Sequence, residues 1–320
     1  MRALITGVSG FAGSHLAEFL LKQGNFDVWG TTRSGAGAAS HLAEVVTFRA
    51  VDLTEPEAVR QLLQECQPER IYHLAAQAFV PISWDDPWPT LENNIRSELN
   101  LLQSLVELKG EARILCVTSM EVYGKTHTDD LPINEQTPLN PDSPYGISKV
   151  AQDMLAGQYF RNYGLCAVTA RPFNHIGPRQ NNRFVAPAFA QQIAEIERGM
   201  RPPILEVGNL DAQRDFSDVR DVVRAYYLLL EQGRPGEAYN IGRGRAHSVR
   251  RLLDLLLSYS SIEIEIQTDP SRLRPSDVPI SYADISKIHQ ATGWEPQISF
   301  ADSLRDVLED WRLRVCVATV

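Results

Sequence analysis

The chain has 320 residues, of which 43% are hydrophobic, and it carries a formal net charge of −9. This composition excludes a disordered chain and provides enough apolar residues for one large core, or for one core and a smaller lobe. The acidic balance argues against a surface that binds nucleic acid or an anionic membrane, and no apolar run approaches the roughly 18 residues of a membrane span. The start of the chain lacks a secretory apolar region, so we expect a cytoplasmic protein.

A cluster of glycines follows the first strand-like run of the chain. Gly7, Gly10 and Gly13 stand where that strand turns into a helix, with the spacing Gly-x-x-Gly-x-x-Gly. Gly7 permits a tight turn, Gly10 lets a pyrophosphate approach the backbone, and Gly13 lets helix and strand pack closely. The pattern predicts a phosphate-binding site at the N-terminus of the helix.

Strand-like runs then alternate with helical patterns, which is typical of a parallel sheet covered on both faces. We therefore expect a doubly wound α/β fold of the Rossmann type. The predicted strands cover residues 27–33, 45–51, 70–74, 113–117 and 166–171, and the predicted helices cover residues 14–23, 91–108 and 145–163.

The end of the second predicted strand bears on the choice of cofactor. An Asp or Glu at this point would bind the adenosine ribose hydroxyls of NAD, but here stand Thr31, Thr32 and Arg33. A guanidinium suits a phosphate, so the sequence favours NADP(H) over NAD(H). The alternative is that Arg33 is a solvated loop charge and that the protein does not distinguish the two cofactors.

Other polar and aromatic residues of the first half have simpler interpretations. His73 lies inside an apolar strand and is expected to be a core histidine, and Trp84 and Trp88 are expected to pack against neighbours. The cysteines show neither a C-x-x-C pair nor metal-ligand spacing, so we expect reduced thiols and no metal. They are Cys66, Cys116, Cys166 and Cys316.

Three residues in the middle of the chain suggest proton transfer. Pro144 indicates a helix start, so Tyr145 and Lys149 lie one turn apart on the same helix face. An ammonium beside a phenol should lower the pKa of Tyr145 from about 10 toward the working pH, as a proton donor to a carbonyl oxygen requires. Ser119, which follows a predicted strand, can hydrogen-bond the same oxygen. A Tyr-x-x-x-Lys pair alone is common on amphipathic helices.

The glycine cluster and the Tyr145/Lys149 pair together resemble the extended short-chain dehydrogenase/reductase family. The resemblance implies NADP(H) as cofactor, Asp52 and Leu53 near its adenine, and Asn93 near the active-site backbone. The full set of expected cofactor contacts is Gly7, Gly10, Phe11, Ala12, Gly13, Arg33, Asp52, Leu53, Leu74, Ala75, Ala76, Gln77, Asn93, Tyr145, Lys149 and His175.

The alternation loosens after the strand that ends at Pro172. We place a cofactor domain in residues 1–172, with residues of about 218–242 returning to it, and a smaller, mainly substrate-binding α/β lobe in residues 173–320. Arg179, Arg214 and Arg274 lie in three separate turn-rich segments of this acidic chain. They suggest a clamp for a phosphate-bearing ligand, although any one of them could be a surface ion pair.

These segments are similar to the GDP-sugar branch of the family, which contains GDP-mannose 4,6-dehydratases and GDP-6-deoxy-4-keto-mannose reductases. Residues 173–180 and 273–279 are closer to the reductases, and the longer arm of the dehydratases is missing. The resemblance implies that the partner is a GDP-linked 4-keto-6-deoxy sugar. The expected substrate contacts are Ser83, Ser119, Asn174, Arg179, Asn209, Arg214, Arg274 and Asp277.

The expected reaction is NADPH-dependent reduction of GDP-4-keto-6-deoxy-D-mannose at C4 to GDP-D-rhamnose, with Ser119, Tyr145 and Lys149 as catalytic residues. Glu121 stands where the dehydratases carry a catalytic base, so the upstream dehydration is an alternative and Glu121 joins the catalytic candidates. A silent NADP-sensing scaffold is a remote alternative, because such proteins usually lose the Tyr/Lys pair. Relatives commonly dimerise through the helices that start near Leu91 and Tyr145, which implies a homodimer with a four-helix bundle.

Overall fold

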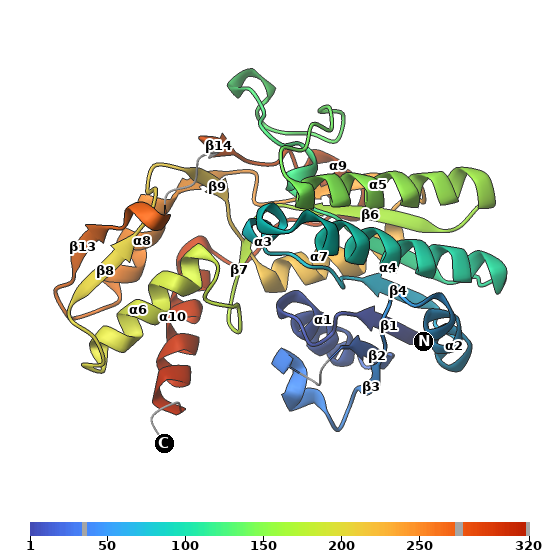
Figure 1. The fold of residues 1–320 in the computed structure, drawn as a ribbon, viewed down its shortest axis with the longest axis horizontal. Coiled ribbons are helices and arrows are strands. Elements are labelled where there is room, and N and C mark those ends of the chain that lie inside the picture. The colour runs from blue at the N-terminus through green and yellow to red at the C-terminus, as the bar shows by residue number, and fades with distance from the viewer. Residues whose placement is uncertain (34–36, 273–277, 318–320) are drawn as a thin grey trace.

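The structure is a computed structural model that describes residues 1–33, 37–272 and 278–317 (Figure 1). Its largest element is a seven-stranded sheet with the strand order β11-β6-β5-β4-β1-β2-β3, in which every neighbouring pair is parallel. From β1 the chain adds β2 and β3 at one side of the sheet, and then adds β4, β5, β6 and β11 at the other side. This order confirms the doubly wound fold. The strands are β1 (Arg2–Thr6), β2 (Asp27–Thr32), β3 (Thr47–Ala50), β4 (Arg70–His73), β5 (Arg113–Val117), β6 (Ala167–Pro172) and β11 (Ala238–Ile241).

Helices cover both faces of this sheet because successive strand residues point to opposite sides. On one face, Ala3 and Ile5 pack under α1 (Phe11–Lys22) and α7 (Val219–Gln232). On the other, Leu4 packs under α2, α4 and α5. These helices span Pro56–Cys66, Pro87–Glu107 and Pro144–Tyr163, and the short α9 (Ser286–Thr292) lies beside α7.

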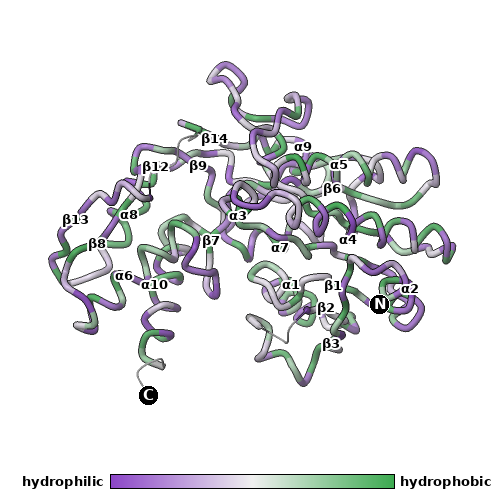
Figure 2. Tube along the Cα trace, in the orientation of Figure 1, coloured by the Kyte–Doolittle hydropathy of each residue, from purple (hydrophilic) through white to green (hydrophobic). Residues whose placement is uncertain are grey.

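A smaller lobe is built around α6 (Val185–Glu197), α8 (Val249–Ser258) and α10 (Phe300–Val317), which share a second buried core. Apolar and polar stretches alternate along α6 and α10, as expected for helices with one buried face (Figure 2). The short strands of this half are β7 (His175–Ile176), β8 (Ile204–Val207), β9 (Gln213–Asp215), β10 (Ser217–Asp218), β12 (Ala246–Ser248), β13 (Glu265–Thr268) and β14 (Ile280–Ser281).

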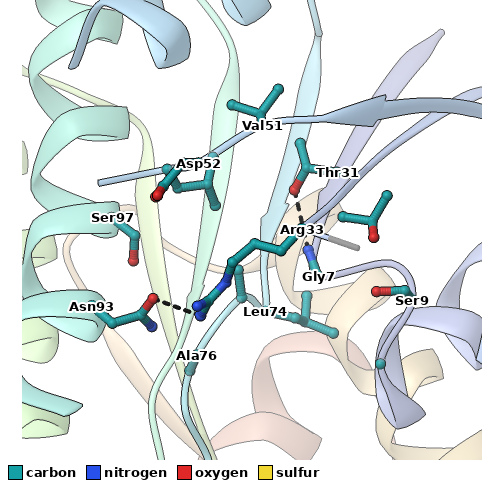
Figure 3. Close-up of a pocket in the computed structure, with 14 residues that line it drawn as sticks. Gly7, Ser9, Thr31, Arg33, Val51, Asp52, Leu74, Ala76, Asn93 and Ser97 are labelled. Carbon is teal, nitrogen blue, oxygen red and sulfur yellow. Dashed lines mark hydrogen bonds between the residues drawn. The ribbon is translucent and has the colours of Figure 1, made fainter. Parts of the chain in front are cut away.

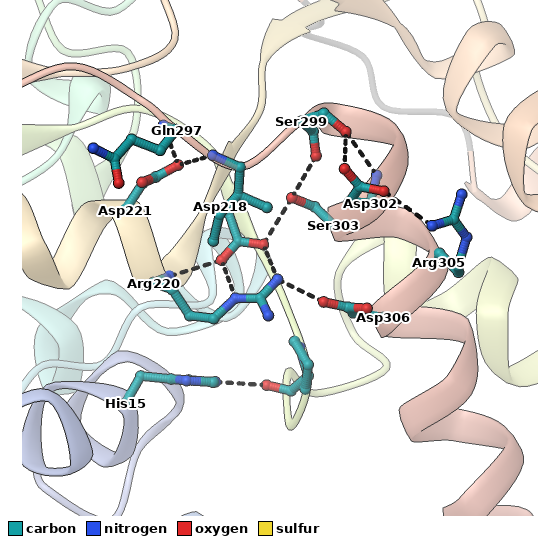
Figure 4. Close-up of polar contacts among 12 residues, drawn as sticks. His15, Asp218, Arg220, Asp221, Gln297, Ser299, Asp302, Ser303, Arg305 and Asp306 are labelled. Carbon is teal, nitrogen blue, oxygen red and sulfur yellow. Dashed lines mark hydrogen bonds and ion pairs between the residues drawn. The ribbon is translucent and has the colours of Figure 1, made fainter. Parts of the chain in front are cut away.

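Buried polar contacts fasten α10 to the start of α7 (Figure 4). Asp218 is 0% exposed and accepts hydrogen bonds from Arg220 Nη2 and from Ser303 Oγ, each at 2.7 Å. The same Arg220 nitrogen lies 2.7 Å from Asp306 of α10. Since β11 and α7 pack with the first sheet, we propose that they belong to the cofactor domain, and the boundary near Pro172 stays a prediction.

The segment before α4 differs from the prediction. It contains an additional helix, α3 (Val80–Asp85), and α4 begins at Pro87 rather than near Leu91. Proline is tolerated in a first helical turn because its missing N–H has no partner there. Trp84 and Trp88, expected to pack, are instead 57% and 66% exposed, so that expectation was wrong.

Candidate active site

A cavity of about 240 Å³ lies at the carboxyl ends of β1, β2, β3 and β4 (Figure 3). It is lined by Gly7, Gly10 and Arg33 on one side, and by Asp52, Leu53 and residues 74–76 on the other. Asn93 of α4 completes the rim. The sequence reasoning named each of these residues as a cofactor contact, and the fold brings them together in one cavity.

The glycine cluster has the geometry that the sequence predicted. Gly7 has a φ of +72°, and a Cβ there would lie 2.9 Å from the Cα of Ala75. A Cβ on Gly13 would lie 2.3 Å from the carbonyl oxygen of Gly7, which is closer than any real contact. Gly10 is exposed and caps α1 without a side chain, so the first N–H groups of α1 remain accessible to an anion.

Arg33 and Asp52 give the cavity its charges. Arg33 Nη2 donates to Asn93 Oδ1 at 2.8 Å, which holds the guanidinium over the cavity (Figure 3). The Asp52 carboxylate accepts from the hydroxyl and the N–H of Thr54, and these hydrogen bonds lower the pKa of Asp52. β2 ends without a carboxylate, and Arg33 follows it. The end of β2 therefore suits the additional phosphate that distinguishes NADP(H) from NAD(H).

Asn93 and its neighbour Asn94 make different contacts. Asn94, which is buried, accepts from the N–H of Gln77 at 2.8 Å and donates to Ser148 Oγ at 3.0 Å. Asn93 lies about 100° further round the helix and faces the cavity instead. Gln77 itself uses its amide nitrogen for Phe79 and Thr90, so its side chain supports the loop before α3.

The three central residues come together between β5 and the start of α5. Tyr145 and Lys149 are 6% and 3% exposed, and Lys149 Nζ lies 5.8 Å from the centroid of the Tyr145 ring. The Lys149 ammonium donates to the Val117 carbonyl at 2.9 Å. Ser119 hydrogen-bonds Tyr145 and also accepts from the Glu121 N–H at 3.2 Å.

The titration of Tyr145 differs from the prediction. Burial raises the pKa of Tyr145 above its usual value, the Ser119 hydrogen bond lowers it in part, and the Glu121 charge raises it further. Burial also lowers the pKa of Lys149 to about 8, against Glu98 and Cys116, which raise it. The pKa of Tyr145 therefore lies above its usual value and not below it as expected, because loss of hydration is the largest effect.

Two expected substrate contacts are used for structural hydrogen bonds. Ser83 is fully buried, and its hydroxyl accepts from the Tyr145 N–H at 3.3 Å and donates to the Val80 carbonyl. The Arg179 side chain lies with its Nη2 3.0 Å from Glu18 of α1, and the backbone N–H of Arg179 donates to Asp310 of α10. The Ser83 side chain therefore joins α3 to α5, and the Arg179 side chain joins the segment after β7 to α1; a substrate contact of either one stays a prediction.

The remaining expected contacts lie on the second half. His175 stacks on Phe11 of α1, with ring centroids 5.8 Å apart, while Ala12 belongs to the same first helical turn. Asn174 is exposed after β6, and Asn209 is exposed and accepts from the Asp211 N–H. Arg214 is half-buried on β9 and donates to the Val278 carbonyl. Arg274 and Asp277 lie outside the described residues.

The absence of a metal site and of a membrane-spanning helix is stated for the described residues, 1–33, 37–272 and 278–317. Among them, no cluster of three His, Cys, Asp or Glu side chains could hold a metal. None of the helices in the described part of the chain is long and apolar enough to cross a membrane. Each of the four cysteines is free.

Comparison with known proteins gives consistent results. Residues 4–307 match the family model described as GDP-mannose 4,6 dehydratase. The GDP-6-deoxy-D-mannose reductase of Pseudomonas aeruginosa is 38% identical over 98% of both chains, and the GDP-mannose 4,6-dehydratase of Vibrio cholerae is 29% identical over 98% of this chain and 94% of its own. The solved structure of RMD from Pseudomonas aeruginosa complexed with NADPH has a TM-score of 0.85 and 36% identity, and covers 98% of this chain and 99% of its own.

Proposed function

We propose a reductase activity for this chain, which belongs to the GDP-mannose 4,6-dehydratase family of extended short-chain dehydrogenases/reductases. The reaction is reduction of the C4 ketone of GDP-4-keto-6-deoxy-D-mannose by NADPH, with GDP-D-rhamnose as product. The observation that carries this assignment is the 38% identity to a GDP-6-deoxy-D-mannose reductase along both whole chains, with the Ser119, Tyr145 and Lys149 group in place.

The cavity at the glycine cluster fits NADP(H). Gly7, Gly10 and the first turn of α1 would hold the diphosphate, and Arg33 would hold the 2′-phosphate. The small side chains of Ala75 and Ala76 would leave room for a nicotinamide ribose close to the backbone. When bound, NADPH supplies the hydride for C4.

At the sugar, Tyr145 donates the proton that the ketone oxygen needs. Because burial raises its pKa, Tyr145 stays protonated, and so ready to donate, across the neutral range. Ser119, already hydrogen-bonded to Tyr145, would donate to the same sugar oxygen, and the Lys149 ammonium would stabilise the phenolate that remains.

The GDP moiety would lie over the smaller lobe. Arg214 and Arg274 would bind the diphosphate, Asn209 would contribute to nucleotide choice, and Asn174 and Asp277 would line the sugar site. Arg179 and Ser83 are left out of this set because of the contacts described above.

The proposal also includes a homodimer and a cytoplasmic location. Apolar side chains on the outer face of α5 support a homodimer in which α4 and α5 form a four-helix bundle, since Ile147 and Met154 are 50% and 59% exposed. The free cysteines support a reducing, cytoplasmic location.

The competing function is the dehydratase reaction, favoured by Glu121 beside Ser119. The two differ in redox balance, since a dehydratase recovers its cofactor in each turnover and a reductase consumes NADPH. The keto sugar plus NADPH should give one NADP⁺ per sugar reduced, and GDP-mannose alone should give nothing. Conversion of GDP-mannose to the keto sugar without added NADPH would instead establish the dehydratase. Product analysis by NMR separates GDP-D-rhamnose from its 4-epimer, GDP-6-deoxy-D-talose.

A further inference from the structure

A buried ion pair joins α5, the helix of Tyr145 and Lys149, to the strand β6. Arg171 of β6 donates to Asp153 of α5 twice, from Nε to Oδ2 at 2.7 Å and from Nη2 to Oδ1 at 2.8 Å. The two side chains are only 6% and 10% exposed. Asp153 lies one helical turn after Lys149, so this ion pair fixes α5 on β6 close to the site. The sequence reasoning named neither Arg171 nor Asp153 as functional.

The same arginine contacts the segment that begins at Ser119. Arg171 Nη1 donates to the Tyr123 hydroxyl at 2.9 Å, and this hydroxyl donates to Asn240 Oδ1 of β11 at 2.7 Å. Tyr123 and Asn240 are both buried. Asn240 is held in turn, because its amide nitrogen donates to the Ile133 carbonyl at 2.9 Å. The Tyr123 side chain is therefore fixed between β6 and β11.

A single tight turn connects Tyr123 to Ser119. Ser119 caps the 3₁₀ turn η2 (Met120–Val122), and Tyr123 ends it. The Val122 N–H donates to the Ser119 carbonyl at 3.3 Å, and the Glu121 N–H donates to the Ser119 hydroxyl at 3.2 Å. Because a turn this short has few free backbone dihedrals, the position of Tyr123 determines where Ser119 lies.

We propose that Arg171 and Tyr123 are positioning residues, which hold Ser119 at the distance from α5 that the reaction needs. One guanidinium contacts both α5, through Asp153, and the turn, through Tyr123, so it sets the distance between the two. A guanidinium suits this role because its fork is planar and rigid. The consequence for catalysis rests on the proposed reduction, in which Ser119 and Tyr145 must meet the same sugar oxygen. The geometry of the turn is a property of the folded chain alone.

The first experiment is steady-state kinetics of Tyr123→Phe, which keeps the buried ring and removes the hydroxyl. Turnover should fall about tenfold, because Ser119 is less well aligned, while KM for the GDP-sugar and the affinity for NADPH stay within about twofold. The matched control is Tyr239→Phe, in which a buried tyrosine of β11 loses a hydroxyl that accepts from the Arg234 N–H at 3.0 Å. The control should keep the parent kcat. A kcat that is unchanged in Tyr123→Phe overturns the proposal.

The same substitution in a Ser119→Ala background tests whether Tyr123 acts through Ser119. Once the Ser119 hydroxyl is gone, its alignment no longer matters, so Tyr123→Phe should lower kcat by less than about twofold further. A full tenfold further loss in that background would mean a structural role that does not involve Ser119, and it overturns the proposal.

The last experiment needs no substrate and so separates this inference from the proposed function. Hydrogen exchange by mass spectrometry is followed in peptides that cover residues 121–123, for Tyr123→Phe and for Arg171→Met. Exchange there should be at least about threefold faster than in the parent, because the turn opens more often without its anchor, and Tyr239→Phe should leave it unchanged. If Arg171→Met does not fold, Tyr123→Phe alone decides. Exchange at the parent rate in Tyr123→Phe overturns the proposal, whereas a parent that does not reduce the keto sugar overturns only the proposed function.

Discussion

The Ser83 hydroxyl accepts a hydrogen bond from the backbone N–H of Tyr145 at 3.3 Å, across 62 positions of the sequence. This contact joins α3 to the first turn of α5, where the helix N-terminus leaves N–H groups without helical partners. Ser143 satisfies a neighbouring one, accepting from the Gly146 N–H at 3.0 Å. Tyr145 is thus oriented by contacts of the helix N-terminus as well as by the helix itself.

Replacing Ser83 by Ala should therefore lower kcat about tenfold and stability by about 1 kcal/mol, because a buried N–H loses its acceptor. KM for the GDP-sugar should change less than twofold. Steady-state kinetics and urea unfolding measure the two effects. A raised KM at constant kcat would return Ser83 to the substrate contacts.

Replacing Tyr145 by Phe keeps the ring and removes the proton donor. Turnover should fall by about 10² to 10⁴, while NADPH affinity, measured by fluorescence titration, stays nearly constant. Tyr163→Phe alters an exposed tyrosine on the same helix and should behave as the parent. Substantial reductase activity in Tyr145→Phe would exclude Tyr145 as the donor.

Cofactor choice should depend on Arg33. The parent should bind NADPH at least tenfold more tightly than NADH, a difference of about 1.4 kcal/mol, and Arg33→Ala should reduce it. Isothermal titration with both cofactors measures this difference in affinity. The control is Arg60→Ala, which also removes one guanidinium, but on α2, where Arg60 pairs with Glu57. Equal affinities in the parent would contradict the assignment.

Substitution of Arg179 tests whether this arginine binds the diphosphate, as expected from the sequence, or only pairs with Glu18, as in the structure. Arg179→Met should lower Tm because the segment after β7 loses its ion pair with Glu18 of α1, and it should leave KM for the GDP-sugar within about twofold. Arg214→Met should raise KM at least tenfold if Arg214 binds the diphosphate. Similar increases in KM for both variants would support diphosphate binding by Arg179 as well as by Arg214.

His15 should make the protein less stable in acid. Burial lowers the pKa of His15 from 6.5 to about 4, and its Nε2 lies 2.9 Å from the Pro178 carbonyl. Below about pH 6.5 the unfolded chain binds a proton at His15 that the folded protein does not bind. The stability from His15 is therefore complete above that pH and is lost as the pH falls toward 4. In urea unfolding, His15→Gln should flatten the slope in this window by up to about 1.4 kcal/mol per pH unit, whereas the exposed His289→Gln should not.

The parts of the site that follow from local chemistry could be predicted from the sequence. Gly7 and Gly13 occupy positions that only glycine fits, and Tyr145 and Lys149 are fixed by helical spacing. The contacts of Asn94 with Gln77 and Ser148 join distant segments, so the sequence pattern, which placed the start of α4 four residues late, does not indicate them.

The rest depends on contacts between distant segments. An arginine in a turn looks the same whether it meets a phosphate or Glu18, so Arg179 could not be separated from Arg214. Glu98 is 0% exposed and accepts a hydrogen bond from Gln152, 54 positions away, a contact that helical spacing alone does not indicate.

The contacts at Asp218 bear on how the chain folds during synthesis. All strands of the large sheet have been made once β11 is complete, but Ser303 and Asp306 leave the ribosome more than sixty residues later. Until then Asp218 lacks its hydrogen bond from Ser303, and the apolar faces of α6 and α8 lack α10. We therefore expect the nascent chain to pass through a state in which the large sheet can form while the apolar faces of α6 and α8 stay exposed, the stage at which a chaperone would bind it.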